Sequence, residues 1–269
     1  MAIDAAVATW RRAGPERPLV IAHRGASRWE LENTVAAFAL AAAQGADGVE
    51  LDVLLCASGD VVVFHDDDLL RLSGRPERVE TLSLRALRRV RLDAGGSRLH
   101  PAASTPAIPT LAEALQACGP RLLVNVELKS QGLFDPTLPQ LVEAVSKVLD
   151  QSGAAPRVVV SSFDPRAVGL WQRRRRDVPC ALLIENGGPA AFCKAMTLPL
   201  LAPAAVHPEA MMCRADVVAA WHGGGYLVNT WTVDDPGELL ALAAAGVDGL
   251  ITNDPAGALA ALSRPGAAQ

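Results

Sequence analysis

The 269-residue sequence is poor in several features that would place it in a familiar class. Aromatic residues make up only 4%, so Leu, Val and Ala must do most of the packing in the core. The net charge of −4 argues against a nucleic-acid partner, whose phosphates favour a basic surface. No apolar run approaches the roughly 18 residues that cross a bilayer, and we therefore expect no stable membrane insertion.

Cysteine is also sparse and unpatterned. The five cysteines are odd in number, widely scattered and free of any CxxC pair, which excludes a disulfide framework and a zinc knuckle. At the N-terminus, Asp4 and the arginines Arg11 and Arg12 stand where a signal peptide would have its apolar core. Both observations predict a cytoplasmic protein. The one dense basic cluster, Arg173–Arg176, is interpreted as the solvated end of a helix.

Short apolar runs rich in β-branched residues alternate with Ala/Leu-rich helical stretches along the chain, which predicts a parallel α/β sheet. Strands are expected at Leu19–Ala22, Val49–Leu55, Val61–Phe64, Leu122–Leu128, Val158–Ser161, Ala181–Ile184, Ala204–Val206, Leu227–Thr232 and Gly249–Thr252. Helices are expected at Thr34–Gln44, Leu111–Ala117, Leu138–Leu149, Ala215–Trp221 and Glu238–Ala244. Barrels of alternating strands and helices commonly reach about 250 residues as one domain, and residues 1–269 are predicted to form one such domain.

Two segments do not fit a regular alternation. The gap of residues 56–60 between two predicted strands is too short for a crossover helix, which takes about a dozen residues. Either those two strands form a hairpin or one of them lies outside the barrel, and both alternatives remain open. Residues 67–109, rich in Arg, Ser, Gly and Pro, are predicted to be an insertion with one helix at Ser83–Val90. The residues after Leu262 are expected to be disordered.

Polar side chains interrupt or follow four of the apolar strands, where burial of such groups is costly. Because side chains at i and i+2 share one face of a strand, Glu50 and Asp52 form one pair, and Glu127 and Lys129 form another. The C-terminal strand ends of a parallel barrel share one rim, which is where such barrels carry their active sites. Seven side chains are therefore expected at that rim: His23, Arg24, Glu50, Asp52, His65, Glu127 and Lys129.

Three converging carboxylates, Glu50, Asp52 and Glu127, would repel one another without a counter-charge. An all-oxygen ligand set suits one divalent cation, Mg²⁺ or Ca²⁺. Taken singly, Glu127 could merely pair with Lys129, but the acids and histidines together favour a site. His23 and His65 lack the spacing of a zinc motif and are interpreted as general acid and base. Of the remaining histidines, His207 is a weak candidate for the pocket rim, and His100 and His222 are expected at the surface.

Arg24 and Lys129 add positive charge to this predicted site. A cation together with these two side chains suits an anionic substrate whose transition state gains charge, as in phosphoryl transfer. A glycosidase would need only the carboxylates, so the two basic residues argue against one.

Several motifs, taken in order, resemble the glycerophosphodiester phosphodiesterase family over about Leu19 to Leu262. They are HRGAS, ENTVAAF, GADGVELDV, VVVFHDDDLLRLSG, VNVELKS, SSFDP, NTWTVDD and GVDGLITNDP. The resemblance implies a TIM-type (β/α)8 barrel that cleaves glycerophosphodiesters, such as deacylated phospholipid head groups, into sn-glycerol 3-phosphate and an alcohol. It also implies a small insertion after an early strand.

The resemblance further implies roles for individual residues. His23 and His65 would be the acid–base pair, and Glu50, Asp52 and Glu127 would hold the metal. The implied contacts to substrate and phosphate come from Arg24, Lys129, Glu32 and Trp231. The family's proline before Glu-Asn-Thr is replaced here by Leu31, which loosens the turn that positions Glu32.

The sequence leaves several alternatives open. One is a lysophospholipase D-type phosphodiesterase, for which the apolar segment 186–203 could line a pocket, and another is a non-catalytic phosphodiester-binding barrel. The nucleophile is either water or the substrate's own 2-hydroxyl. The sequence assigns neither the acid and base roles of the two histidines nor an oligomeric state.

Overall fold

Eight parallel strands form a closed ring in the computed structural model, which describes residues 2–11, 17–93, 106–132, 135–187 and 196–263. The ring order is β1-β9-β8-β7-β6-β5-β4-β2, and pairing of β1 with β2 closes it. This confirms the predicted TIM-type (β/α)8 barrel. The barrel strands are β1 (Leu19–His23), β2 (Gly48–Leu55), β4 (Leu123–Leu128), β5 (Val158–Ser162), β6 (Cys180–Ile184), β7 (Ala205–Pro208), β8 (Leu227–Thr230) and β9 (Gly249–Thr252).

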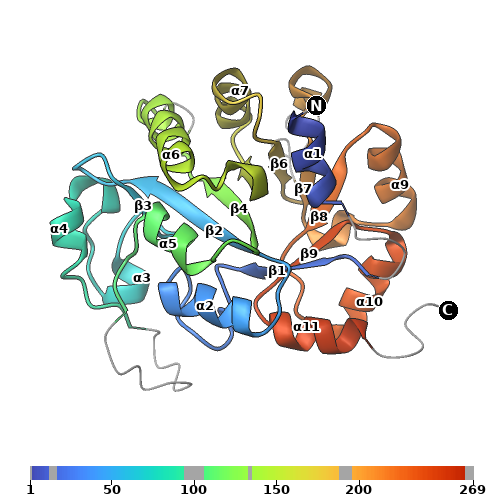
Figure 1. The fold of residues 1–269 in the computed structure, drawn as a ribbon, viewed down its shortest axis with the longest axis horizontal. Helices are drawn as coiled ribbons and strands as arrows, with labels where there is room; N and C mark the ends of the chain where they lie inside the picture. The colour runs from blue at the N-terminus through green and yellow to red at the C-terminus, as the bar shows by residue number, and fades with distance from the viewer. Residues whose placement is uncertain (1, 12–16, 94–105, 133–134, 188–195, 264–269) are drawn as a thin grey trace.

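Helices surround the ring (Figure 1). They begin and end where local sequence favours it: the Thr110 side chain and Glu113 form a capping box on α5. Gly45, Gly153 and Gly246 follow helices with positive φ, a conformation that favours glycine at helix ends. The surrounding helices are α2 (Val35–Ala43), α5 (Leu111–Ala117), α6 (Leu138–Ser152), α7 (Pro165–Arg174), α9 (Ala215–Gly223), α10 (Pro236–Ala245) and α11 (Pro255–Leu262).

The ninth strand belongs to a hairpin. β3 (Val61–Val63) runs antiparallel to the end of β2, with Val53 opposite Val63 and Leu55 opposite Val61. The turn contains Gly59 at a φ of +82°, a conformation that glycine adopts without steric cost. Both alternatives left by the sequence therefore hold: the two strands form a hairpin, and β3 lies outside the ring of eight.

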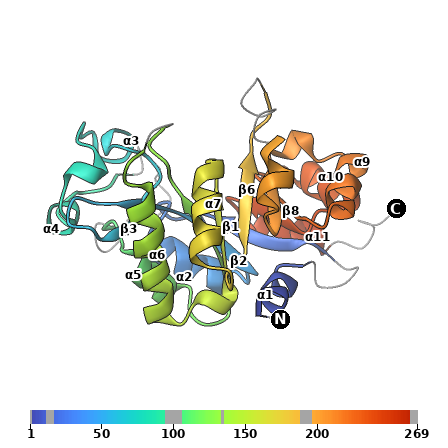
Figure 2. The same ribbon diagram turned by 90° about the horizontal axis from the view of Figure 1, so that it is seen from above.

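The segment after β3 lies to one side of the ring in Figure 2 and has its own apolar cluster. It contains α3 (Leu70–Ser73), a 3₁₀ turn at Val79–Thr81 and α4 (Leu84–Leu87), so the expected helix at Ser83–Val90 is shorter than predicted. Leu69, Leu72 and Leu87 pack there against the outer face of the hairpin, at Leu54 and Val62. The predicted surface residue His100 lies outside the described residues, as does most of the tail after Leu262.

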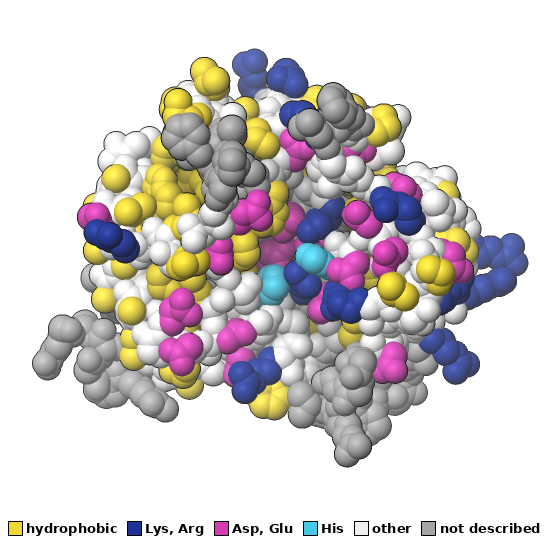
Figure 3. Space-filling view, turned by 180° about the vertical axis from the view of Figure 1, so that it is seen from behind, with side chains coloured by type: hydrophobic (Ala, Val, Ile, Leu, Met, Phe, Trp, Pro, Cys, Tyr) yellow, Lys and Arg dark blue, Asp and Glu magenta, His cyan; other side chains and the backbone are white. Residues whose placement is uncertain are grey.

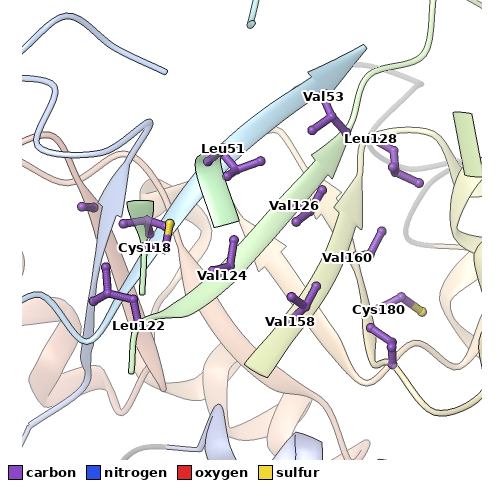
Figure 4. Packing of buried hydrophobic residues seen from close by; sticks show 14 of the residues in the cluster. Leu51, Val53, Cys118, Leu122, Val124, Val126, Leu128, Val158, Val160 and Cys180 are labelled. Atoms are coloured by element: carbon purple, nitrogen blue, oxygen red, sulfur yellow. The ribbon is translucent and has the colours of Figure 1, made fainter. Parts of the chain in front are cut away.

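Alternate residues of each strand point outward and pack beneath the helices. Figure 4 shows this layer on neighbouring strands, including Val124 and Val126 of β4 and Val158 and Val160 of β5. Each fully buried Val or Leu side chain contributes about 1.5–3 kcal/mol relative to an exposed one. The intervening residues of β4 point into the barrel, and they include Asn125.

A helix that the sequence did not predict, α1 (Ala2–Thr9), lies at the end of the barrel where the strands begin (Figure 2). The Trp10 side chain that follows it is 1% exposed and belongs to one apolar cluster with Leu19, Ile21 and Leu227 inside the barrel. That end is therefore closed by apolar packing. Within the described part of the chain, no helix combines the length and apolar character needed to span a bilayer.

Two predictions about ionisable residues are wrong. Arg175 is not solvated: its side chain is 7% exposed and donates hydrogen bonds to Asp150, Asp177 and the carbonyl and hydroxyl of Ser146. The remaining arginines of that run do lie at the surface, so the interpretation fails only where the chain leaves α7 and turns inward. His207 does not lie at a pocket rim: it is fully buried inside the barrel on β7.

Candidate active site

A cavity of about 290 Å³ opens among the C-terminal ends of the strands. Figure 3 shows histidine side chains in a hollow of this face, with basic and acidic side chains gathered around them. The volume is close to the lower limit for small-molecule sites. The cavity is lined by His23, Arg24, Glu50, His65, Asn125, Glu127, Phe163, Leu183, Glu185, Trp231, Thr232 and Ile251.

The end of β1 and the turn after it position His23 and Arg24. Arg24 has a φ of +56° and Gly25 one of +85°. A Cβ atom at Gly25 would lie 2.6 Å from the Cβ of Ala37, so only glycine lets this turn pack against α2. The backbone amide of Arg24 donates to Glu50 Oε2 at 3.1 Å, which ties the turn to β2.

Glu50, Asp52 and Glu127 converge inside the barrel mouth. Asp52 on β2 lies opposite Glu127 on β4, and one oxygen from each of the three lies within 4.8 Å of the others. Their exposures are only 4%, 1% and 8%. Burial raises the pKa of Glu50 well above its ordinary value, and the negative charges of Asp52 and Glu127 raise it further. Burial and the charge of Asp52 raise the pKa of Glu127 to about 7.

The three carboxylates fit a divalent cation. Glu50 Oε1 is buried and has no hydrogen-bond partner among the described residues. Buried carboxylates that share one small space without enough donors are stabilised by a hard cation, for which oxygen atoms are the preferred ligands. The donor set consists of carboxylate oxygens.

Basic side chains already offset part of this negative charge. Lys129 Nζ lies 2.9 Å from Glu127 and 3.5 Å from Asp52, and Arg24 Nε lies 3.3 Å from Asp52. Asn33 Nδ2 donates to Asp52 at 2.9 Å. Burial alone would raise the pKa of Asp52, but Lys129 and Arg24 together lower it. Asp52 therefore stays ionised between two cations.

His23 is oriented by Asn253, which directly follows β9. Its Nδ1 lies 2.8 Å from Asn253 Oδ1, and that oxygen can only accept, so Nδ1 carries the proton. Nε2 is left with its lone pair on the side of Glu50, whose Oε2 lies 4.0 Å away. Burial, followed by the charge of Arg24, lowers the pKa of His23. Asn253 is itself held by Asp234, to which its amide donates at 2.6 Å.

His65 is oriented by a chain of ion pairs that the sequence did not predict. Its Nδ1 lies 2.6 Å from Asp66 Oδ1, and Arg71 Nε donates to Asp66 Oδ2 at 2.7 Å. Arg71 also donates to both oxygens of Glu32, at 2.6 and 2.9 Å, and Glu32 accepts from Arg24 at 2.9 Å. One arginine on α3 therefore links the loop of His65 to the loop of Arg24.

An aromatic wall faces the histidines. Trp231 donates from Nε1 to the carbonyl of His207 at 2.7 Å. Its ring meets that of Phe163 edge to face, with centroids 5.4 Å apart and planes at 87°. The hydrogen bond holds the indole of Trp231 directly after β8.

The structure brings all nine predicted site residues into one region. Asp52, Lys129 and Glu32 do not line the cavity themselves but contact residues that do. Asn33, Asn253 and Arg71 were missed although each lies in a quoted motif, because their contacts with Asp52, His23 and Glu32 join segments far apart in the sequence. His222, expected at the surface, is partly exposed and pairs with Asp248 at 2.9 Å. Residues 188–195 of the segment 186–203 lie outside the described residues.

The chain is similar to proteins of one family. Residues 23–257 match the glycerophosphoryl diester phosphodiesterase family. The glycerophosphodiester phosphodiesterase of Caldanaerobacter subterraneus is 32% identical over 240 residues, which cover 89% of this chain and 95% of that protein. A Silicibacter pomeroyi structure, described as a candidate member, is 26% identical with a TM-score of 0.87, covering 96% of this chain and 97% of that one.

A second solved structure adds a ligand. An Oleispira antarctica phosphodiesterase, in complex with its product sn-glycerol-3-phosphate, is 26% identical with a TM-score of 0.80, covering 92% of this chain and 98% of that one. The family match spans most of the chain, and both structures share its barrel. The chain therefore belongs to the glycerophosphoryl diester phosphodiesterase family of hydrolases.

Proposed function

We propose that this protein hydrolyses glycerophosphodiesters to sn-glycerol 3-phosphate and an alcohol. The observation that carries the proposal is that His23 and His65 line one cavity, next to the three buried carboxylates that converge there. The product bound by the Oleispira relative supports the glycerol phosphate side of the reaction. A small-molecule phosphodiester also suits the size of the cavity, about 290 Å³.

Glu50, Asp52 and Glu127 would hold one divalent cation, Mg²⁺ or Ca²⁺. When bound, such an ion neutralises charge on a phosphoryl oxygen and makes a nearby hydroxyl more acidic. The protein's part is to keep three carboxylates together in a buried place, which Lys129, Arg24 and Asn33 achieve through their contacts with Asp52.

The two histidines supply proton transfer. Asn253 and Asp66 hold the Nδ1 atoms of His23 and His65, so each ring presents Nε2 for chemistry. One histidine accepts the proton of the nucleophile, which is either water or the substrate's own 2-hydroxyl, and the other donates a proton to the oxygen of the departing alcohol. The two histidines together neither gain nor lose a proton over the reaction, since one takes a proton from the nucleophile and the other gives one to the leaving group.

Arg24 and Lys129 stabilise the anionic phosphoryl group. Arg24 lines the cavity, and Lys129 contacts Glu127, which lines it too; Glu32, Asp52 and Glu127 fix the positions of the two basic side chains. Preorganised cations of this kind stabilise charge that develops in the transition state without having to rearrange. Trp231 forms the opposite wall and would confine the substrate.

The proposal is tested by replacing each histidine. His23→Ala and His65→Ala are expected to lower kcat on glycerophosphocholine by about 10²–10⁴-fold, the usual contribution of a general acid or base. His222→Ala is the matched control, because His222 lies outside the cavity. Circular dichroism checks that each variant folds. Unchanged turnover in either cavity variant would remove the role proposed for that histidine.

A further inference from the structure

We propose that Asn125 binds a hydroxyl group of the glyceryl part of the substrate and so determines specificity for glycerol-containing diesters. This inference rests on the function proposed above. Asn125 lies on β4, points into the barrel and is 1% exposed. It lines the cavity, directly opposite Glu50 in the β2–β4 pairing and two residues before Glu127.

The Asn125 amide is unpaired on both sides. Neither Nδ2 nor Oδ1 has a hydrogen-bond partner among the described residues, although both atoms are buried. The other buried asparagines near the site differ in this respect. Asn33 donates to Asp52, and Asn229 is paired through Nδ2 with His207. A buried amide with both atoms free inside a ligand cavity is suited to meet a ligand.

The chemistry of the amide selects the kind of group that it would meet. Asn presents one donor, Nδ2, and one acceptor, Oδ1. A phosphate oxygen only accepts, and a cation would use Oδ1 alone. A hydroxyl both donates and accepts, so of the groups that the substrate offers it is the one that can satisfy both amide atoms together. The glyceryl group of the substrate carries two such hydroxyls.

The position of Asn125 also orients the substrate. Two apolar residues line the cavity with it, Leu183 on β6 and Ile251 on β9, and both lie inside the ring. A glyceryl hydroxyl at Asn125 places the glyceryl group deepest in the cavity. The departing alcohol then lies toward the open mouth. Diesters with different alcohols would share one glyceryl site.

The test is a cycle that combines variants and substrates. We would measure kcat/KM of the full-length protein on glycerophosphocholine and on two analogues, each lacking one glyceryl hydroxyl. The wild type should lose about tenfold or more on at least one analogue, because a site built to hydrogen-bond a hydroxyl rejects a substrate without it. In Asn125→Ala that same loss should shrink to near unity, and Asn125→Ser, which keeps a donor and an acceptor, should restore part of it.

Asn229→Ala is the matched control, since Asn229 is 1% exposed and inside the same barrel but does not line the cavity. It should discriminate against both analogues as the wild type does. Equal discrimination by wild type and Asn125→Ala would overturn the inference and leave the proposed function intact. Failure of the wild type to cleave glycerophosphocholine at all would overturn both.

A crystal structure of the wild type with sn-glycerol 3-phosphate tests the same inference without a variant. A glyceryl hydroxyl within hydrogen-bonding distance of Nδ2 and Oδ1 of Asn125 is the expected result. A structure in which only water or a phosphate oxygen meets the amide would overturn it.

Discussion

Acid should destabilise this protein in part through one histidine inside the barrel. His207 on β7 is fully buried, and its Nε2 accepts a hydrogen bond from Asn229 Nδ2. Burial lowers the pKa of His207 to about 3 from an ordinary value of 6.5. The folded state therefore binds fewer protons than the unfolded state between these pH values, so stability is lost as the pH falls through that window.

The size of the effect follows from the shift in pKa. Each unit corresponds to about 1.4 kcal/mol, so the full window from 6.5 to about 3 is worth roughly 5 kcal/mol. By about pH 5 the loss should reach roughly 2 kcal/mol. His207→Gln removes the titration, because the Gln carbonyl can accept the bond from Asn229 but takes up no proton.

The assay is urea unfolding of both proteins at about pH 7 and about pH 5. Buried carboxylates that titrate in the same range affect the wild type and His207→Gln alike, so the difference between their pH slopes isolates His207. We expect the wild type to lose about 2 kcal/mol more than the variant over this interval. Equal losses in the two proteins would refute the reasoning.

Three further predictions concern ion pairs and the cation site. Arg71→Ala should lower kcat by about ten- to a hundredfold, the usual cost of losing a hydrogen-bond partner that orients a catalytic side chain. Arg75→Ala breaks only an exposed ion pair and should leave kcat unchanged. Equal rates for the two variants in steady-state assays would contradict this. Arg175→Ala should lower the free energy of unfolding by about 1–3 kcal/mol because buried acceptors lose their donor. Arg176→Ala should change it by less than about 0.5 kcal/mol, and equal values in chemical denaturation would count against the buried network. Mg²⁺ or Ca²⁺ at about a hundred times its Kd should raise the free energy of unfolding of the wild type by about 2.7 kcal/mol, measured by thermal unfolding. The same cation should stabilise Glu50→Gln by much less. Equal stabilisation of the two proteins would exclude Glu50 as a ligand.

Much of the barrel could be predicted because its signals are local. The strands of a parallel barrel are continuous apolar runs, and their polar interruptions mark the inward-facing residues at the rim. Glu50, Asp52 and Glu127 converge as their two-residue spacing and strand positions indicated. The hairpin at β3 stayed undecided because a five-residue gap is compatible with more than one pairing.

The features that the sequence did not reveal depend on contacts between distant segments. Arg71 lies in an Arg-rich insertion and differs from its neighbours only by reaching Glu32 and Asp66. Arg175 lies in a run of four arginines, and only the path of the chain after α7 buries it. Trp10 belongs to no strand or helix pattern in the sequence, yet its side chain closes the end of the barrel where the strands begin.

The measurement that tests the account most directly is release of sn-glycerol 3-phosphate from glycerophosphocholine by the purified protein. It would be run with EDTA, and then with Mg²⁺ or Ca²⁺ restored. The account predicts that EDTA abolishes the release and that a divalent cation restores it. It also predicts that Glu127→Gln releases no sn-glycerol 3-phosphate even with the cation present. Release that persists in EDTA, or no release with either cation, would contradict it.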